Sequence, residues 1–196
     1  MKLVLRNCVV SVLLAAGLAG CTQNDDRRAG TSRAIAVYYP GLELGLTVGE
    51  ARSRFPDLIF RPYYGFTTDT PSNDGTFRRV GLRVGQSIGP DQPVESDRVR
   101  TIDLFGDSAA AALSVVAHLR RALGSKPRHG CGGQEYSILV WHWSVNGESI
   151  TVVQNSQAAD GGELVVMVLS APAQPPTAVV NNYKPEPCTR NLGTVR

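Results

Sequence analysis

The sequence predicts an α+β domain in which two helices pack on one face of an antiparallel sheet. Two observations predict this class. Two amphipathic segments carry the start and stop signals of helices, and each is followed by three strand-like runs of apolar or alternating residues. Because the order of one helix and three strands occurs twice, the pattern also favours a tandem α-β-β-β duplication.

The first helix is expected to begin at Thr47. Thr47 and Glu50 have the spacing of a capping box, in which each side chain accepts a hydrogen bond from an unpaired amide at the helix start. Apolar residues follow at helical spacing from Val48 to Phe55. Pro56 then ends the helix, because proline lacks the amide that the next turn would need.

The second helix is expected to open at Asp107 or Ser108, both of which are favourable N-cap residues. Gly124 is a natural residue for the left-handed position after a helix, and Pro127 prevents continuation. The predicted apolar stripe consists of Ala109, Ala112, Leu113, Val116, Arg120 and Leu123, with the Arg120 stem lying on apolar surface.

Six runs are typical of strands. The Asn-Gly dipeptide at 146–147 predicts a hairpin that places Trp143 opposite Ile150 and puts Trp141 on the same face. The last run is apolar from Leu164 to Leu169, which favours a central or doubly buried strand. The six runs are Leu58–Arg61, Phe77–Val84, Arg98–Phe105, Tyr136–Trp143, Gly147–Gln154 and Glu163–Leu169.

The first residues have the pattern of a targeting signal. Lys2 and Arg6 precede an apolar stretch that is too short to span a bilayer. The following Leu18-Ala19-Gly20-Cys21 resembles the lipobox of bacterial lipoprotein signal peptides. The resemblance implies that residues 1–20 are removed and that Cys21 carries a diacylglyceryl group, so that acyl chains such as palmitate anchor the protein to a membrane. The alternative is an ordinary secretory peptide, which would leave Cys21 as a free thiol or a disulfide partner.

The domain organisation follows from the anchor and from composition. We expect a signal peptide over 1–20, a lipidated flexible tether over 21–40, a globular domain over 41–170 and a Pro-rich tail over 171–196. By the sorting pattern of bacterial lipoproteins, Thr22 rather than aspartate after the anchor implies the outer membrane, facing the periplasm, if the cell has one. We therefore expect the protein in the cell envelope.

The charge balance argues against a nucleic-acid partner. The 196 residues include 20 basic and 17 acidic side chains. Removal of Lys2 and Arg6 with the leader leaves 18 basic against 17 acidic groups. A surface so close to neutrality does not supply the phosphate neutralisation on which bulk nucleic-acid binding depends.

Two cysteines remain after Cys8 leaves with the leader and Cys21 receives its lipid. An even pair in an oxidising compartment predicts one disulfide, between Cys131 and Cys188. The alternative is a metal site that uses His129 with Cys131. Metal sites usually take their ligands from two such clusters, and the sequence has no second one.

A short motif resembles one family of small lipoproteins. Residues 45–51, Gly-Leu-Thr-Val-Gly-Glu-Ala, are similar to the helix start of the SmpA/OmlA-like outer-membrane lipoproteins. Those proteins assist β-barrel assembly, and β-lactamase-inhibitor-type modules share their fold. The resemblance implies a binding module. The long linker, the Pro-rich tail and the single copy of the motif depart from the family pattern.

No catalytic residue, metal or cofactor is predicted. His118 is expected on the exposed face of the second helix, His129 in a loop, and His142 on the strand face opposite the two tryptophans. No known catalytic or nucleotide-binding motif occurs. Asp103 and Asp107 are near one another in sequence, but the simpler interpretation is a solvated strand face and a helix N-cap.

The candidate partner-binding residues are aromatic and basic. Four rings crowd residues 60–66 before a polar loop, and tyrosine with arginine in such a loop is typical of interface hot spots. Arginines also gather on two neighbouring strand-like runs, where a basic sheet face near a membrane could meet anionic lipid headgroups or a phosphate-bearing glycan. The alternative for the rings is that they only cap the core. The alternative for the arginines is a solvated sheet face on which Glu95, Asp97 and Asp103 neutralise their charge. The candidate residues are Phe60, Tyr63, Tyr64, Phe66, Arg79 and Arg83.

These observations favour a non-enzymatic envelope lipoprotein, a membrane-tethered module that binds a protein or another envelope component. One alternative is a small-ligand-binding or enzymatic protein with a cleft between two helix-plus-sheet halves. Another is a lipid-carrying chaperone, which would need a closed apolar cavity.

Overall fold

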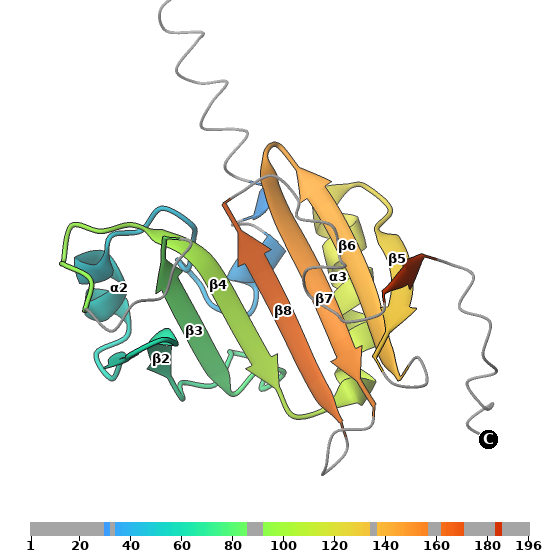
Figure 1. Ribbon diagram of the computed structural model, residues 1–196, viewed down its shortest axis with the longest axis horizontal. Coiled ribbons are helices and arrows are strands. Elements are labelled where there is room, and N and C mark those ends of the chain that lie inside the picture. The colour runs from blue at the N-terminus through green and yellow to red at the C-terminus, as the bar shows by residue number, and fades with distance from the viewer. Residues whose placement is uncertain are drawn as a thin grey trace, which may run out of the picture.

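The chain folds around one antiparallel sheet of nine strands, in the order β1-β2-β3-β4-β8-β7-β6-β5-β9 (Figure 1). The computed structural model describes residues 30–31, 34–85, 92–133, 137–156, 162–170 and 183–185. The elements are α2 (Val48–Arg54), β1 (Ile59–Arg61), β2 (Gly65–Thr68), β3 (Arg79–Val84), β4 (Val99–Gly106), the 3-10 helix η1 (Ala109–Ala111), α3 (Ala112–Leu123), β5 (Arg128–Gly132), β6 (Ile138–Val145), β7 (Glu148–Asn155), β8 (Glu163–Leu169) and β9 (Lys184–Pro185).

The predicted α+β class with tandem α-β-β-β units is wrong. The sheet dominates the fold, and α2 and α3 have only seven and 12 residues. Helix α2 is followed by four strands and α3 by five, all in one continuous sheet, and the sequence pattern does not reveal β2, β5 and β9. Since β4 pairs with β8 in the middle of this sheet, the chain does not divide into two separate three-stranded layers.

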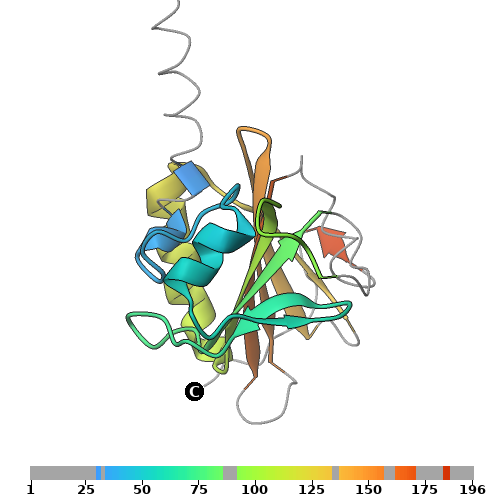
Figure 2. The same cartoon turned by 90° about the vertical axis from the view of Figure 1, so that its left-hand side faces the viewer.

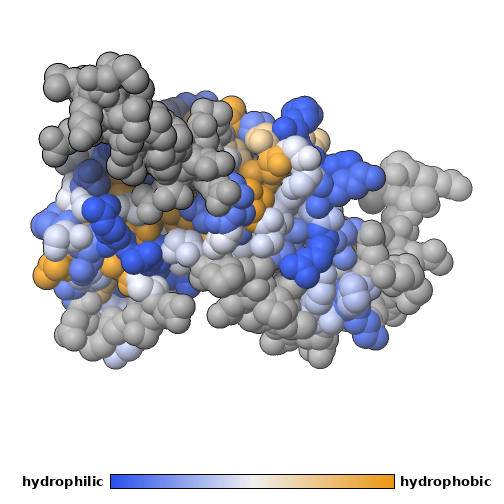
Figure 3. All heavy atoms as spheres, turned by 90° about the horizontal axis from the view of Figure 1, so that it is seen from above, coloured by the Kyte–Doolittle hydropathy of each residue, from blue (hydrophilic) through white to orange (hydrophobic). Residues whose placement is uncertain are grey.

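The hydrophobic core lies between the sheet and the helices. Both α2 and α3 lie on the same side of the sheet (Figure 2). One row of buried side chains crosses six neighbouring strands through successive register partners: Phe66, Leu82, Ile102, Val168, Ile150 and Trp143. Seen from above, hydrophilic side chains cover much of the described surface, with hydrophobic ones visible between them (Figure 3).

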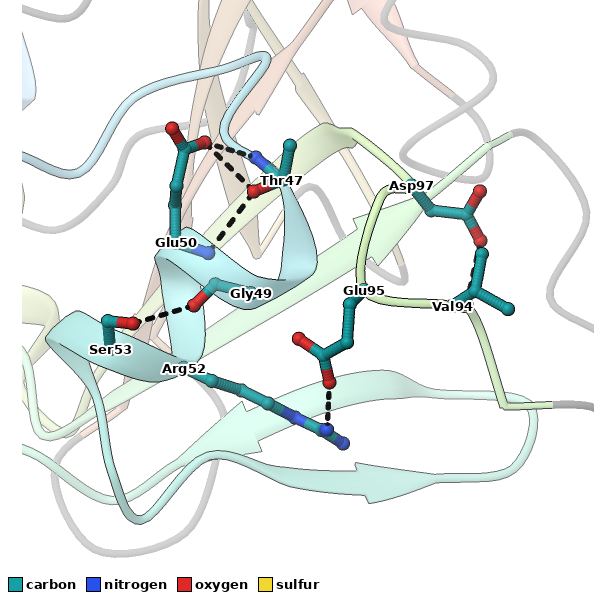
Figure 4. A network of polar contacts seen from close by, with 8 residues as sticks. All are labelled: Thr47, Gly49, Glu50, Arg52, Ser53, Val94, Glu95 and Asp97. Atoms are coloured by element: carbon teal, nitrogen blue, oxygen red, sulfur yellow. Dashed lines mark hydrogen bonds and ion pairs between the residues drawn. The ribbon is translucent and has the colours of Figure 1, made fainter.

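Helix α2 begins as predicted. The Thr47 hydroxyl accepts from the Glu50 amide at 3.2 Å, and the Glu50 carboxylate accepts from the Thr47 amide at 2.8 Å (Figure 4). Both bonds of the capping box are therefore present. An ion pair between Arg52 and Glu95 ties the helix to the turn before β4, and the Asp97 carboxylate closes that turn by accepting from the Val94 amide at 2.9 Å.

The second predicted helix is present as η1 followed by α3, and its predicted buried face is partly right, since Ala109, Ala112 and Val116 are buried. The buried residues are Ala112, Val115, Val116 and Leu119, whereas Leu113 is 68% exposed. His118 is half-buried, and its Nε2 lies 3.0 Å from the Ala34 carbonyl. The N-terminal segment thus packs beside α3, which the sequence of the helix alone does not reveal. Gly124 adopts the left-handed C-cap conformation.

The predicted β6–β7 hairpin is confirmed. Asn146 and Gly147 have φ angles of 51° and 84°, and a type I′ hairpin turn requires positive φ at both of its central residues. Trp143 pairs with Ile150 and Trp141 with Val152. Both tryptophans are buried, which supports the core-packing interpretation for these rings.

The globular domain begins before residue 41. Ala34, Ile35, Tyr38 and Tyr39, which the sequence analysis placed in the tether, are buried in the core. Apolar burial therefore fixes this stretch on the domain. In the expected tail, β9 pairs with β5 at the sheet edge, a position that Pro185 tolerates.

Several predictions lie outside the described residues. They are the signal peptide over 1–20, lipidation of Cys21, most of the tail, and Cys188. Among the described residues, no helix combines the length and the apolar character needed to cross a bilayer.

Candidate functional site

A pocket of about 810 Å³ opens on the sheet face opposite the helices. Its volume falls in the range of small-ligand sites. The β1–β2 turn forms one wall, and side chains from β3, β4 and β8 form the floor. These three strands lie side by side in the sheet (Figure 1). The lining residues are Arg61, Pro62, Tyr63, Tyr64, Thr67, Asp69, Arg79, Gly81, Arg83, Asp103, Phe105, Val165 and Met167.

Strand alternation explains how these side chains meet. Along β3, Val80 and Leu82 are fully buried in the core, so Arg79, Gly81 and Arg83 face the other way. Gly81 is the register partner of Asp103, which in turn pairs with Met167 on β8. Because Gly81 has no side chain, the Phe105 ring and the Asp103 side chain can lie over it, 3.3 Å and 3.5 Å from the position that a Cβ would take.

The most deeply buried charge in the pocket is Asp103. Its residue is 8% exposed, and the Arg83 Nη2 lies 3.1 Å from its Oδ1 and 2.9 Å from its Oδ2. Burial raises the pKa of Asp103, and the opposing effect of the Arg83 charge and hydrogen bond does not overcome it. The ion pair therefore fixes Arg83 in the floor while it leaves a desolvated carboxylate beside the cavity.

Arg79 has a different environment. Its guanidinium lies over the Phe105 ring at 4.4 Å from the centroid, a cation–π contact. No carboxylate forms an ion pair with it among the described residues. The buried Nε atoms of Arg79 and Arg83 also lack a hydrogen-bond partner there. An unsatisfied buried donor costs about 1–3 kcal/mol, so both groups are a local cost to the fold.

The aromatic wall stands on a strained turn. The Tyr64 amide donates to the Arg61 carbonyl at 3.0 Å, which closes a four-residue turn with Pro62 and Tyr63 at its centre. Tyr63 has a φ of 65°, in a position that normally takes glycine. Strain of this kind costs on the order of 1–3 kcal/mol and gathers at functional sites. Tyr63 and Tyr64 are 62% and 73% exposed.

The structure brings together four of the six candidate partner-binding residues. Tyr63, Tyr64, Arg79 and Arg83 line the pocket. Phe60 and Phe66 do not, and their rings pack against each other at 5.3 Å on the core side. Phe66 pairs with Leu82 and is 1% exposed, so the alternative of core packing describes these two rings.

Of the two cysteines predicted to form a disulfide, only Cys131 lies among the described residues. Cys131 on β5 is buried and takes part in a disulfide bond. No second cysteine lies among the described residues, so Cys188 as its partner stays a prediction. The neighbouring His129 stacks on the Trp141 ring at 5.0 Å. In the described part of the chain, no group of three or more metal-ligating side chains gathers.

His142 is buried away from the pocket. Its Nδ1 lies 2.8 Å from the Thr151 hydroxyl, and its Nε2 has no partner among the described residues. Burial lowers the pKa of His142, and the Arg128 charge lowers it further. The ring is therefore neutral near pH 7.

The sequence analysis missed the floor of the pocket. Asp103 was interpreted as part of a solvated strand face, but it is buried. Phe105 and Met167 drew no attention because their meeting depends on the pairing of β4 with β8, which are far apart in sequence. An aspartate among apolar residues in a central strand was the one available signal.

Comparisons with protein-family models, with curated proteins and with solved structures find no match. The resemblances to the lipobox and to the SmpA/OmlA-like lipoproteins therefore stay predictions.

The raised pKa of Asp103 predicts a pH-dependent cost of folding. Between its unfolded and folded pKa values the native state binds more protons, so its contribution to stability falls as pH rises. We expect the unfolding free energy of wild type relative to Asp103→Asn to decrease from pH 4 to pH 7 in urea titrations. Asp57→Asn is the control of opposite sign, because hydrogen bonds from Thr68 and Thr70 lower the pKa of Asp57 below its ordinary value of 3.8. Its contribution to stability is present above that value and is lost as pH falls below it, so the titration of this control extends to lower pH. Equal slopes for the two variants would contradict the assignment.

Proposed function

We propose that the chain is a non-enzymatic, lipid-anchored binding module of the cell envelope. It is tethered through Cys21 and binds a protein or another envelope component at the pocket. If the cell has an outer membrane, the domain faces the periplasm from it.

The observation that carries the proposal is the composition of the pocket rim. Tyr63 and Tyr64 are exposed beside Arg79 and Arg83, and Tyr63 holds a strained conformation that packing does not require. Tyrosine and arginine are the residues most enriched at binding hot spots. Exposed rings on a strained turn therefore support a role in recognition rather than in stability.

The location is supported by the leader and by the cysteines. The Leu18–Cys21 motif has the composition of a lipid-attachment signal. Participation of Cys131 in a disulfide suits an oxidising compartment outside the cytoplasm.

A second candidate function is the binding of a small ligand. The pocket volume of about 810 Å³ favours it. An enzyme would need convergent polar groups, and a cluster of His142, Asp103 and Cys131 in one pocket would favour it. Of these three residues, only Asp103 lines the pocket.

The partner-binding part is tested by affinity capture from detergent-solubilised envelopes. The double variant Tyr63→Ala/Tyr64→Ala is expected to lose the captured component while its thermal unfolding is unchanged. Leu113→Ala is the matched control, because Leu113 is 68% exposed on α3 on the other side of the sheet. Identical captured sets from wild type and the double variant would overturn the assignment of the pocket rim.

The anchoring part is tested by cell fractionation and intact mass. Wild type is expected in the membrane fraction with an acylated Cys21, whereas Cys21→Ser is expected to leave that fraction. Wild type that lacks acyl chains at Cys21 would overturn the anchor without affecting the pocket.

A further inference from the structure

The charges of the pocket are unevenly satisfied. Three arginines and two aspartates line it. One aspartate, Asp103, already pairs with Arg83. Arg79 has no ion pair among the described residues, and its Nε is a buried donor without an acceptor. Arg79 therefore brings to the lining a positive charge that no described carboxylate neutralises, and this charge favours an anion.

The remaining floor is apolar. Phe105, Val165 and Met167 lie beside the arginines and are partly exposed to the cavity. The Phe105 ring supports the Arg79 guanidinium at 4.4 Å, which holds that group against the floor rather than in solvent. A planar guanidinium fixed in this way matches the paired oxygens of a carboxylate or phosphate.

We propose that the pocket binds an organic anion, with its carboxylate or phosphate at the Arg79 guanidinium beside the Arg83–Asp103 pair and its apolar body on Phe105 and Met167 beneath the Tyr63–Tyr64 turn. The inference rests on the proposed function, because it names the ligand chemistry of the same pocket.

Asp103 sets the strength of this site. Its buried carboxylate occupies the Arg83 Nη2 and places a negative charge beside the position of the ligand. A bound anion must therefore compete with Asp103 for the charge of Arg83. Arg79 has no described carboxylate as a competitor and can pair with the anion directly. The variants Arg79→Gln and Asp103→Asn should consequently change affinity in opposite directions, which a purely structural role for either residue would not produce.

The test titrates the full detergent-extracted chain with four matched probes followed by saturation-transfer NMR. They are 4-phenylbutyrate, phenyl phosphate, the neutral 4-phenylbutanol and the cationic 4-phenylbutylamine. We expect an anionic probe to bind at least about tenfold more tightly than the alcohol and the amine, because hydrogen bonds to charged groups are the strong ones. The tighter of the two anions identifies the head group as carboxylate or phosphate.

The variants assign the effect to residues. Arg79→Gln should weaken the anion by about tenfold, Arg79→Lys by less, and Asp103→Asn should strengthen it several-fold. Arg78→Gln is the control for net charge, because Arg78 pairs with Asp107 outside the pocket. If Arg79→Gln does not fold, as judged by its thermal transition, Arg79→Lys and Asp103→Asn still decide the question.

Three results would overturn the inference: equal binding of the alcohol and the anions, tighter binding of the amine, or equal losses from Arg79→Gln and Arg78→Gln. If one of these results is found while capture of the envelope component still depends on Tyr63 and Tyr64, the anion proposal is wrong and the proposed function is retained.

Discussion

Replacement of Trp143 by alanine is expected to lower the free energy of unfolding by about 3–5 kcal/mol. The side chain is 2% exposed and forms the end of the apolar row that crosses the sheet from Phe66. Its indole Nε1 also donates to the Ser125 carbonyl at 3.1 Å, which connects the sheet to the loop after α3. Urea titration followed by circular dichroism measures the loss.

The control for this variant is Tyr64→Ala. Tyr64 is also aromatic, but it is 73% exposed. We expect its removal to change stability by no more than about 0.5 kcal/mol. Similar losses from the two variants would show that Trp143 is not part of the core.

Gly65→Ala is expected to destabilise the β1–β2 hairpin by at least about 2 kcal/mol. Gly65 has a φ of 82°, and a Cβ there would lie 2.5 Å from the Leu82 carbonyl oxygen on the neighbouring strand. The clash involves backbone, so β2 would have to move away from β3. Hydrogen exchange should show lost protection of the β2 amides, and the wall of the pocket should be lost with it.

Gly75→Ala separates the two causes of this effect. Gly75 has a similar φ of 73°, but no atom lies within 4 Å of the position that its Cβ would take. Its cost should therefore be that of the backbone conformation alone, about 1 kcal/mol. Equal costs at the two glycines would contradict the close approach of Gly65 to β3.

Local chemistry made part of the fold predictable. The capping box of α2 and the Asn146-Gly147 turn each depend on residues a few positions apart, and both are present. Strand β2 escaped because its aromatic and glycine residues also fit a loop, and β5 (Arg128–Gly132) because two of its five residues are glycine. The predicted fold class is wrong for this reason, since β2, β5 and the edge strand β9 enlarge the sheet to nine strands.

The site was predictable on one side only. Tyr63, Tyr64, Arg79 and Arg83 have hot-spot chemistry that the sequence displays directly. Asp103 and Met167 join them through register partners across β3, β4 and β8, and pairing of strands far apart in sequence leaves no local signal. The same lack of a local signal explains why the prediction places the exposed Leu113 on the buried face of α3, because that face depends on the packing of residues 34–39.

Photocrosslinking in growing cells tests whether the Tyr63–Tyr64 side of the sheet is the binding face of an anchored protein. A photoreactive benzoylphenylalanine is placed at position 64 or, as control, at position 113 of the full chain, since both side chains are largely exposed. We expect a covalent adduct from position 64 in the membrane fraction and none from position 113. Equal adducts from both positions, or an adduct from position 113 alone, would show that this side of the sheet is not the binding face.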